Sequence, residues 1–278
     1  MGNNDAGLLH PIAVLKESAA GWLKNIIPLV LFYSVNVALS FMLKATNEAA
    51  AASASTVKPW ISSSIVVLEV VLTAILSSFI CFFCVTYFKQ FADGKRSAFM
   101  AAYKEACAGF AGYLKAMAIL LVFILGVLSV AILFSEWGKS FYWAKGSGNH
   151  SMRMGVLLGT STVSVALSIA VAWYGFFFFF APLIAAFEKM GVFAAIRESR
   201  SRVRGNALRL LAPFLMLGVL YIAVGVLLIL IATRFTLDRR ILDLIDPVMI
   251  TLFAPLALIL WFVSYRKITE LKQKTHLA

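Results

Sequence analysis

Residues 192–210, with the sequence VFAAIRESRSRVRGNALRL, have the pattern of a basic amphipathic helix that leads directly into an apolar segment. Phe193, Ile196 and Val203 recur at helical intervals, which predicts that they share one face of the helix. Three arginines repeat in the same way, offset towards the other side: Arg197, Arg200 and Arg204. We therefore expect this helix to lie in the headgroup layer of a membrane, with its apolar side towards the acyl chains and its guanidinium groups towards phosphates.

The composition of the whole chain is typical of a multi-pass membrane protein. Of its 278 residues, 62% are hydrophobic and 14% are charged, and the mean hydropathy is +0.90. Soluble domains contain about 45–50% apolar and about 25% charged residues. The net charge of +12 would also suit a nucleic-acid-binding protein, but the lysines and arginines cluster beside apolar segments, as the positive-inside rule requires. We expect one integral membrane domain over residues 1–278 and no nucleic-acid partner.

Six apolar segments are long enough, or nearly long enough, to cross a hydrocarbon core about 30 Å thick. They cover residues 26–43, 61–88, 114–134, 155–187, 207–232 and 247–265. Most of the 25 lysines and arginines lie in the N-terminal segment, in the links at 89–115 and 189–209, and in the C-terminal tail. This distribution predicts an all-α membrane protein with six transmembrane helices whose N- and C-termini are cytoplasmic.

The basic amphipathic motif occurs more than once in the chain. The sequence AVLKESAAGWLKN at 13–25 aligns without a gap with AAIRESRSRVRGN at 194–206, and a fainter copy, AAYKEACAGFAGY, lies at 101–113. Four residues of the first copy, Lys16, Glu17, Ser18 and Asn25, correspond to Arg197, Glu198, Ser199 and Asn206 of the third. The middle copy keeps Lys104 and Glu105. Basic residues before a span are common, but the shared asparagine argues against a chance match.

Each copy of the motif precedes two apolar segments. This arrangement predicts three repeats, approximately 10–92, 96–190 and 191–274, each made of an amphipathic interfacial helix followed by a two-span hairpin. An even number of spans in each repeat keeps all of the repeats in the same orientation. We therefore expect a pseudo-threefold axis along the membrane normal.

The third copy also resembles part of a known group of proteins. Residues 194–217, AAIRESRSRVRGNALRLLAPFLML, are similar to a recurring element, A-L-x-x-S-x-x-L-V-R-G-N followed by apolar residues. That element belongs to six-span bacterial inner-membrane proteins allied with the membrane domain of glycerophosphodiester phosphodiesterases. The resemblance is specific over this stretch, loose elsewhere, and covers no phosphodiesterase domain. It implies a bacterial inner-membrane location and six spans, but no catalytic residues.

Glu69 is an ionisable residue inside the second apolar segment. It lies about 12–13 Å deep at 1.5 Å per residue, where a carboxylate is costly unless it is protonated, hydrated or paired. Asn36 lies at a similar depth on the preceding segment, within reach of Glu69 across the predicted hairpin. Two interpretations remain open: a structural hydrogen bond between a protonated Glu69 and Asn36, and an intramembrane site for a proton or an ion.

Seven basic residues are the candidate contacts to anionic lipid headgroups. They are Lys16, Lys24, Lys104, Lys115, Arg197, Arg200 and Arg204. Each basic residue near an anionic surface contributes roughly 1 kcal/mol to membrane attraction. Arg202 belongs to the same cluster, and Glu198 four residues earlier predicts a weak pair with it. The arginines either set topology and attract the surface without specific binding, which we favour, or recognise an anionic lipid or a phosphorylated ligand.

Other motifs indicate packing rather than chemistry. Gly155 and Gly159 form a GxxxG motif, which predicts close helix packing within the chain, with homodimerisation as the alternative. The chain contains no HExxH, GxSxG or Walker-type motif, and Cys81 and Cys84 are interpreted as small apolar residues rather than metal ligands. We therefore expect a protein that is not an enzyme and that holds no cofactor or metal.

Two functions from different classes fit these patterns. The first is a non-enzymatic inner-membrane protein that contacts anionic lipid and organises the membrane or partner proteins, with another protein or a second copy of the chain as its protein partner. The second is a small transporter or channel with a polar site near Asn36 and Glu69, or along the hydroxyls of Thr160, Ser161, Thr162 and Ser164. A water-filled path would favour the transporter, whereas a closely packed bundle would favour the first function.

Overall fold

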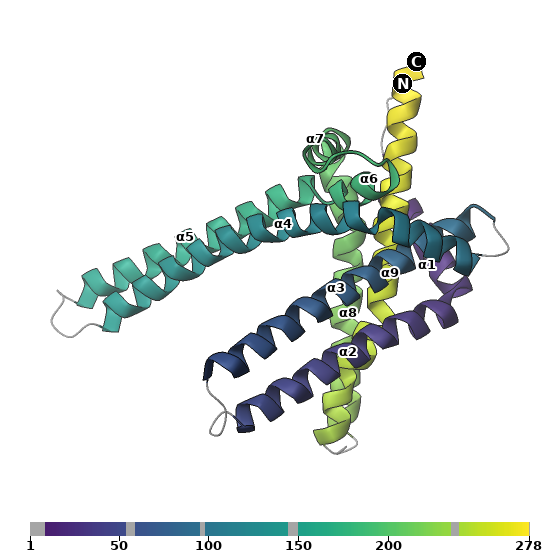
Figure 1. The fold of residues 1–278 in the computed structure, drawn as a ribbon. Helices are drawn as coiled ribbons and strands as arrows, with labels where there is room; N and C mark the ends of the chain where they lie inside the picture. Colours follow the sequence, from purple (N-terminus) through teal and green to yellow (C-terminus); the bar gives the residue numbers. More distant parts are fainter. Residues whose placement is uncertain (1–8, 54–58, 95–97, 144–149, 235–238, 278) are drawn as a thin grey trace. The chain divides into compact units, whose positions relative to one another are not determined.

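The computed structural model describes residues 9–53, 59–94, 98–143, 150–234 and 239–277 (Figure 1). Within these ranges the side chains are described except at 36, 39–40, 43–53, 59–69, 98, 143, 150–153, 172, 239–244 and 275–277. The described residues form α1 (Pro11–Lys24), α2 (Ile26–Ser53), α3 (Pro59–Ala92), α4 (Ala98–Trp143), α5 (His150–Phe177), α6 (Ala181–Phe187), α7 (Val192–Val203), α8 (Ala207–Arg234) and α9 (Arg239–Leu277), and they contain no strand. The prediction of an all-α protein is confirmed.

Within the described ranges, five helical segments are long and apolar enough to cross a membrane. They are Val70–Ala92, Phe99–Tyr142, Met154–Phe187, Ala207–Arg234 and Ile245–Lys274, and they overlap the second to the sixth predicted spans. The helix α1 and the first part of α2, Ile26–Val35, pass the same test only together, and they are bent by 82° relative to each other. The chain is thus a multi-pass membrane protein with five candidate spans, or six if the bent pair forms one span.

Contacts between helices divide the chain into two compact units, with a boundary inside α4. The first unit comprises residues 1–110 and 208–278, and the second comprises residues 111–207. In the first unit α2 packs against α3 and α9, and α1 packs against α9. Figure 1 shows α2 and α3 side by side, with opposite chain directions. Aromatic side chains contribute to the contacts of the first unit. The ring of Phe88 in α3 meets the ring of Phe262 in α9 edge to face, with centroids 5.9 Å apart. The expectation of one membrane domain stays a prediction.

In the second unit the later part of α4 lies beside α5, and α6 packs against α7 (Figure 1). The hydroxyl of Ser164 in α5 donates to the carbonyl of Ala131 in α4 at 2.8 Å. At Gly138 the two helices approach so closely that an added Cβ would lie 1.9 Å from Oγ1 of Thr160. Small side chains therefore set the spacing between α4 and α5.

The three amphipathic copies lie in α1, in the first part of α4 and in α7, and they bury the same two positions. The buried residues are Val14, Ala102 and Ala195, followed one turn later by Ser18, Ala106 and Ser199. Residues four apart lie on the same side of a helix, so each copy packs through one narrow face of small residues. This face was not predicted, because the hydrophobic pattern emphasises the larger side chains.

The predicted apolar face of α7 is wrong in one respect. Phe193 is 76% exposed, whereas Val203 is fully buried. The two residues are ten positions apart, which at 3.6 residues per turn separates their side chains by about 80° around the helix axis. Phe193 therefore lies on the exposed side together with Arg197, and Val203 lies on the buried side together with Ser199.

Two of the amphipathic copies end before the following helix begins, and the third does not. The helix α1 ends at Lys24 and α2 begins at Ile26. The helix α7 ends at Val203 and α8 begins at Ala207, with Gly205 at a φ of +87° between them. In contrast, α4 continues from the middle copy into a long apolar helix without a break.

Candidate functional site

The exposed side of each amphipathic copy combines an apolar residue with a basic residue one turn later. The apolar residues are Ile12, Met100 and Phe193, each more than half exposed. The basic residues are Lys16, Lys104 and Arg197, all exposed. Because residues four apart are neighbours on a helix surface, each copy presents an apolar side chain beside a cation. Helices that lie at a membrane surface have this pattern, with the apolar group in the acyl boundary and the cation near the phosphates.

All seven cations predicted to contact lipid headgroups are exposed. They are Lys16, Lys24, Lys104, Lys115, Arg197, Arg200 and Arg204. Among the residues that the structure describes, none of the seven has a carboxylate at ion-pair distance. Their charges are therefore not compensated within the described part of the chain.

Two other lysines are only partly exposed, and each forms an ion pair with a glutamate. Lys89 contacts Glu105, which also accepts a hydrogen bond from Gln90. Lys267 contacts Glu17, with Nζ 2.6 Å from Oε2. Sequence reasoning missed both pairs, although the lysines end two similar segments, VTYFK at 85–89 and VSYRK at 263–267. Their partners, Glu105 and Glu17, also occupy the same position of the amphipathic motif. The sequence therefore contained a signal for both pairs, because both members of one pair have a counterpart in the other.

Arg202 differs from the other arginines of α7, because its side chain is only 7% exposed. Its two terminal nitrogens donate to the two carboxylate oxygens of Glu188, both at 2.7 Å. Its Nε donates to Oε1 of Glu198 at 2.8 Å. The weak pair predicted between Glu198 and Arg202 is therefore part of a network with a bidentate pair at its centre. Arg202 does not belong to the exposed cationic surface.

Ser199 connects α7 to the break between α5 and α6. Its hydroxyl donates to the carbonyl of Phe177 at 2.9 Å and accepts a hydrogen bond from the backbone N–H of Phe180 at 3.2 Å. The turn at 178–180 removes both backbone groups from regular helical bonding, and a buried backbone group without a partner is costly. The buried hydroxyl thus holds α7 against the end of α5. Sequence reasoning identified Ser199 only as a repeated residue.

The end of α5, the following turn and the exposed side of α7 form a pocket of about 310 Å³. The pocket is lined by Trp173, Tyr174, Phe177, Phe178, Arg200 and Arg204. The rings of Trp173 and Phe177 meet edge to face, with centroids 5.6 Å apart. Two of the predicted lipid-contacting arginines therefore share a pocket with four aromatic residues, an arrangement that the sequence did not predict.

The structure describes one of the two polar sites that were predicted inside the membrane and not the other. Asn36 and Glu69 lie outside the residues whose side chains are described, so their pairing remains a prediction. In α5, the hydroxyl of Thr160 donates to the carbonyl of Val156 at 2.9 Å, and that of Thr162 donates to the carbonyl of Leu158 at 2.8 Å. Together with the bond from Ser164 to α4, these contacts show hydroxyls engaged by backbone carbonyls.

The glycines of the GxxxG motif are exposed. A Cβ added at Gly155 or Gly159 would meet no neighbouring atom of the described chain within 4 Å. Close approach occurs instead at Gly138, against Thr160, and at Gly112, where an added Cβ would lie 3.0 Å from the carbonyl oxygen of Ala185. The described part of the chain therefore uses other glycines for packing, and homodimerisation through Gly155 and Gly159 remains a prediction.

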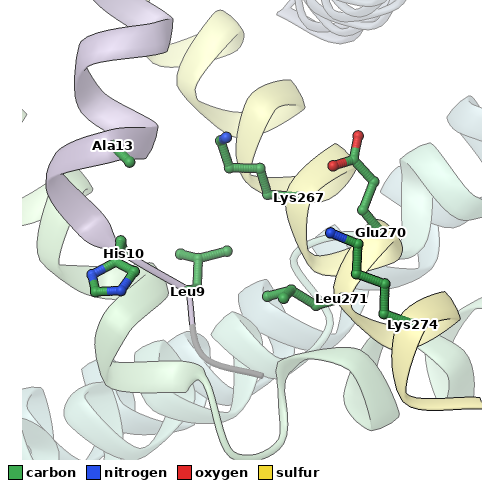
Figure 2. A pocket seen from close by; sticks show the side chains of 7 residues that line it. All are labelled: Leu9, His10, Ala13, Lys267, Glu270, Leu271 and Lys274. Carbon is green, nitrogen blue, oxygen red and sulfur yellow. The ribbon is translucent and has the colours of Figure 1, made fainter. Parts of the chain in front are cut away.

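A smaller pocket, of about 200 Å³, lies between the start of α1 and the last turns of α9 (Figure 2). Figure 2 shows Leu9, His10 and Ala13 on one side and four residues of α9 on the other: Lys267, Glu270, Leu271 and Lys274. Lys267 is paired with Glu17, and Glu270 accepts a hydrogen bond from Nε of Arg266 at 3.0 Å. Most charges of this pocket are thus compensated, and its contacts join the first helix to the last.

Comparison of the chain with protein-family models, with curated proteins and with solved structures finds no match. The resemblance of residues 194–217 to six-span inner-membrane proteins therefore stays a prediction. The functional conclusion rests on the exposed cations, their aromatic neighbours and the helices that position them.

Proposed function

We propose that this chain is a non-enzymatic inner-membrane protein that contacts anionic lipid headgroups through three basic interfacial helices and thereby organises the membrane or partner proteins. The observation that carries the proposal is a difference between exposed and more buried cations. The exposed cations of the amphipathic copies lack carboxylate partners among the described residues, whereas the more buried Lys89, Arg202 and Lys267 are neutralised. Charges left uncompensated beside exposed apolar residues suit a surface of lipid phosphates.

The proposal includes a common plan for the three copies. In this plan the copies belong to three repeats of an interfacial helix and two spans, related by a pseudo-threefold axis, with both termini in the bacterial cytoplasm. Burial of the same two positions in every copy supports it. The glutamate of each copy also takes part in an ion pair, through Glu17, Glu105 and Glu198. A shared packing face and a shared acidic partner are more than a chance similarity of basic helices would require.

A transporter remains the alternative, with its site near Asn36 and Glu69. The hydroxyls of α5 do not favour it, because Thr160, Thr162 and Ser164 donate to backbone carbonyls. Hydroxyls satisfied in this way stabilise helix packing and do not require a water-filled path.

The test measures lipid selectivity around the full-length protein in nanodiscs that mix phosphatidylcholine with phosphatidylglycerol. Spin-labelled versions of the two lipids report which lipid is immobilised at the protein surface. The variant Lys16→Gln/Lys104→Gln/Arg197→Gln removes the exposed cation of each copy. Because each cation near an anionic surface contributes roughly 1 kcal/mol, we expect the preference for phosphatidylglycerol to fall several-fold.

The matched control removes three exposed cations outside the amphipathic copies, through Lys139→Gln/Arg234→Gln/Lys274→Gln. We expect this control to retain most of the lipid preference. An equal loss in both variants would show that net charge alone attracts the lipid. Wild-type protein without any preference for the anionic lipid would contradict the proposed function itself.

A further inference from the structure

We infer that the pocket between α5 and α7 binds the phosphate group of one anionic phospholipid, with Arg200 and Arg204 on the phosphate and the aromatic wall against the glycerol and acyl part. The inference rests on the proposed function, because it assigns one defined site within a general contact with anionic lipid. The six lining residues all belong to the second compact unit.

The pocket keeps an uncompensated positive charge. Arg200 and Arg204 are four residues apart, so their side chains extend from neighbouring positions on the helix surface. Glu198, within α7, and Glu188, just before it in the sequence, are engaged by Arg202. Neither Arg200 nor Arg204 has a carboxylate partner among the described residues. Two guanidinium groups without counter-charge are suited to a phosphate, which accepts several charge-assisted hydrogen bonds.

The wall opposite the two arginines is aromatic. Trp173 and Tyr174 are 41% and 56% exposed, and both lie within the last two turns of the membrane-spanning helix α5. Aromatic residues with one apolar and one polar end are typical of the headgroup level of a membrane. A free phosphate ion would gain little from four aromatic residues, whereas the glycerol and first acyl carbons of a lipid would bury apolar surface against them. The lining therefore favours an amphiphilic anion.

Hydrogen bonds within the protein hold the two walls of the pocket together without a ligand. The buried hydroxyl of Ser199 joins α7 to the end of α5 through Phe177 and Phe180. The network of Arg202 joins the same helix to Glu188, which follows α6. A volume of about 310 Å³ is within the range of small-molecule sites. A site held on both sides loses less freedom when it binds a ligand.

Other pockets of the described chain lack this combination. The two pockets between α8 and α9, of about 320 and 500 Å³, are lined mainly by apolar residues. The pocket between α1 and α9 contains cations, but Lys267 is already paired. Only at α5 and α7, among these pockets, do two uncompensated arginines face aromatic side chains.

The test titrates dioleoyl phosphatidylglycerol into the full-length protein in neutral detergent and counts retained lipids by native mass spectrometry. We expect one lipid to bind more tightly than the others, and phosphatidylcholine to bind weakly. Arg200→Gln/Arg204→Gln should weaken the tight binding by at least about tenfold, because hydrogen bonds to charged groups are lost. Lys189→Gln removes an exposed cation of the same unit that lies outside both the pocket and the amphipathic copies; it is the control and should leave the tight site in place.

A second variant, Trp173→Leu, approaches the pocket from its other wall without a change of charge. We expect it to weaken the tight binding several-fold while the unfolding temperature stays near that of wild type. Tight binding that survives both pocket variants would overturn the inference. Equal weakening by Lys189→Gln and by substitution of the arginine pair would also overturn it, because it would indicate diffuse attraction.

Two soluble competitors identify the source of the phosphate. Inorganic phosphate and glycerol 3-phosphate lack acyl chains, so neither should displace the lipid, whereas dihexanoyl phosphatidylglycerol should. Displacement by the soluble phosphates at the same concentration would overturn the lipid assignment. Absence of a tight site with nanodisc selectivity intact would overturn this inference and leave the proposed function standing, whereas absent selectivity with a tight lipid retained would contradict the proposed function and leave the site standing.

Discussion

The amphipathic copies in α1 and α7 end in a break, whereas the copy in α4 continues. At the first break, Asn25 donates from its backbone N–H to the carbonyl of Trp22 at 3.0 Å and from its side-chain amide to the carbonyl of Gly21 at 2.9 Å. Its own carbonyl accepts a hydrogen bond from the N–H of Leu29 at 3.1 Å, at the start of α2. In α4 the corresponding residue is Tyr113, which is buried within a continuous helix.

This difference shows what an amphipathic helix needs in order to turn before the apolar helix that follows it. The last carbonyls of a helix lose their intrahelical donors, and asparagine can replace one donor with its side chain. At the second break, the N–H of Asn206 donates to the carbonyl of Val203 at 3.0 Å, next to Gly205 with its positive φ. Gly112 occupies the position of Gly205 in α4, and yet that helix continues. The asparagine therefore distinguishes the broken copies from the continuous one, and glycine alone does not.

The largest expected effect is at Arg202, which holds the broken copy in α7 to the residue after α6. Arg202→Leu leaves the carboxylates of Glu188 and Glu198, whose side chains are 29% and 22% exposed, without their buried cation. Removal of one partner of a fully buried pair typically costs about 3–5 kcal/mol, and because these carboxylates keep some contact with water we expect a loss of unfolding free energy towards the lower end of this range. Unfolding of the detergent-solubilised protein measures it, with Arg197→Leu as an exposed control. Recovery of stability when Glu188→Gln and Glu198→Gln are added would assign the loss to uncompensated charge, and a loss no larger than that of the control would contradict the network.

An intermediate effect is expected at Asn25, where the break itself is tested. Asn25→Ala leaves the carbonyl of Gly21 without its side-chain donor, which costs about 1–3 kcal/mol for a buried group. Spin labels at the exposed positions Ile12 and Leu31 report the distance across the bend between α1 and α2. We expect the distance distribution to broaden and to shift towards the longer separation of a straighter helix. Lys24→Ala is the control beside the break, and an unchanged distribution in Asn25→Ala would show that the side chain does not maintain the bend.

The smallest effect is expected at Gly205. An alanine at a φ of +87° is strained, and the left-handed region costs an ordinary residue about 1–2 kcal/mol. Gly205→Ala should therefore lower stability by about this amount, and Gly205→Asn should lower it less, because asparagine tolerates this region better. Gly126→Ala is the control and should raise stability, because alanine favours a helix more than glycine does. Gly126 lies inside α4 with no described atom within 4 Å of an added Cβ. A stable Gly205→Ala variant would indicate that the second break does not depend on its glycine.

The same comparison shows how much of the fold could be predicted from the sequence. Long apolar runs predicted most of the helices that can cross a membrane, because length and hydropathy are local properties of the chain. The exposure of Lys16, Lys104 and Arg197 also followed from the helical period. The repeated asparagine was visible in the sequence too, although only as a sign of repetition and not as the point where a helix turns.

Other features depend on contacts between segments that are distant in sequence. The bidentate pair of Arg202 with Glu188 requires that α7 folds back on the end of α6, which no local pattern indicates. The bonds of Ser199 require that α7 meets the break at 178–180, inside the span predicted at 155–187. The different exposure of Phe193 and Val203 depends on the narrow face through which α7 packs. Local periodicity cannot identify that face, because its residues are small.

The exposed cations and the buried Arg202 differ in how strongly added salt weakens their interactions. At about 0.15 M salt the Debye length is about 8 Å, so interactions between exposed charges weaken as salt is added, whereas close pairs with little contact to water are screened much less. Lys16, Lys104, Arg197, Arg200 and Arg204 lie in the first class, and the bonds of Arg202 lie in the second. If the amphipathic helices contact lipid as proposed, added salt should therefore weaken their attachment to the bilayer before it weakens their attachment to the rest of the protein.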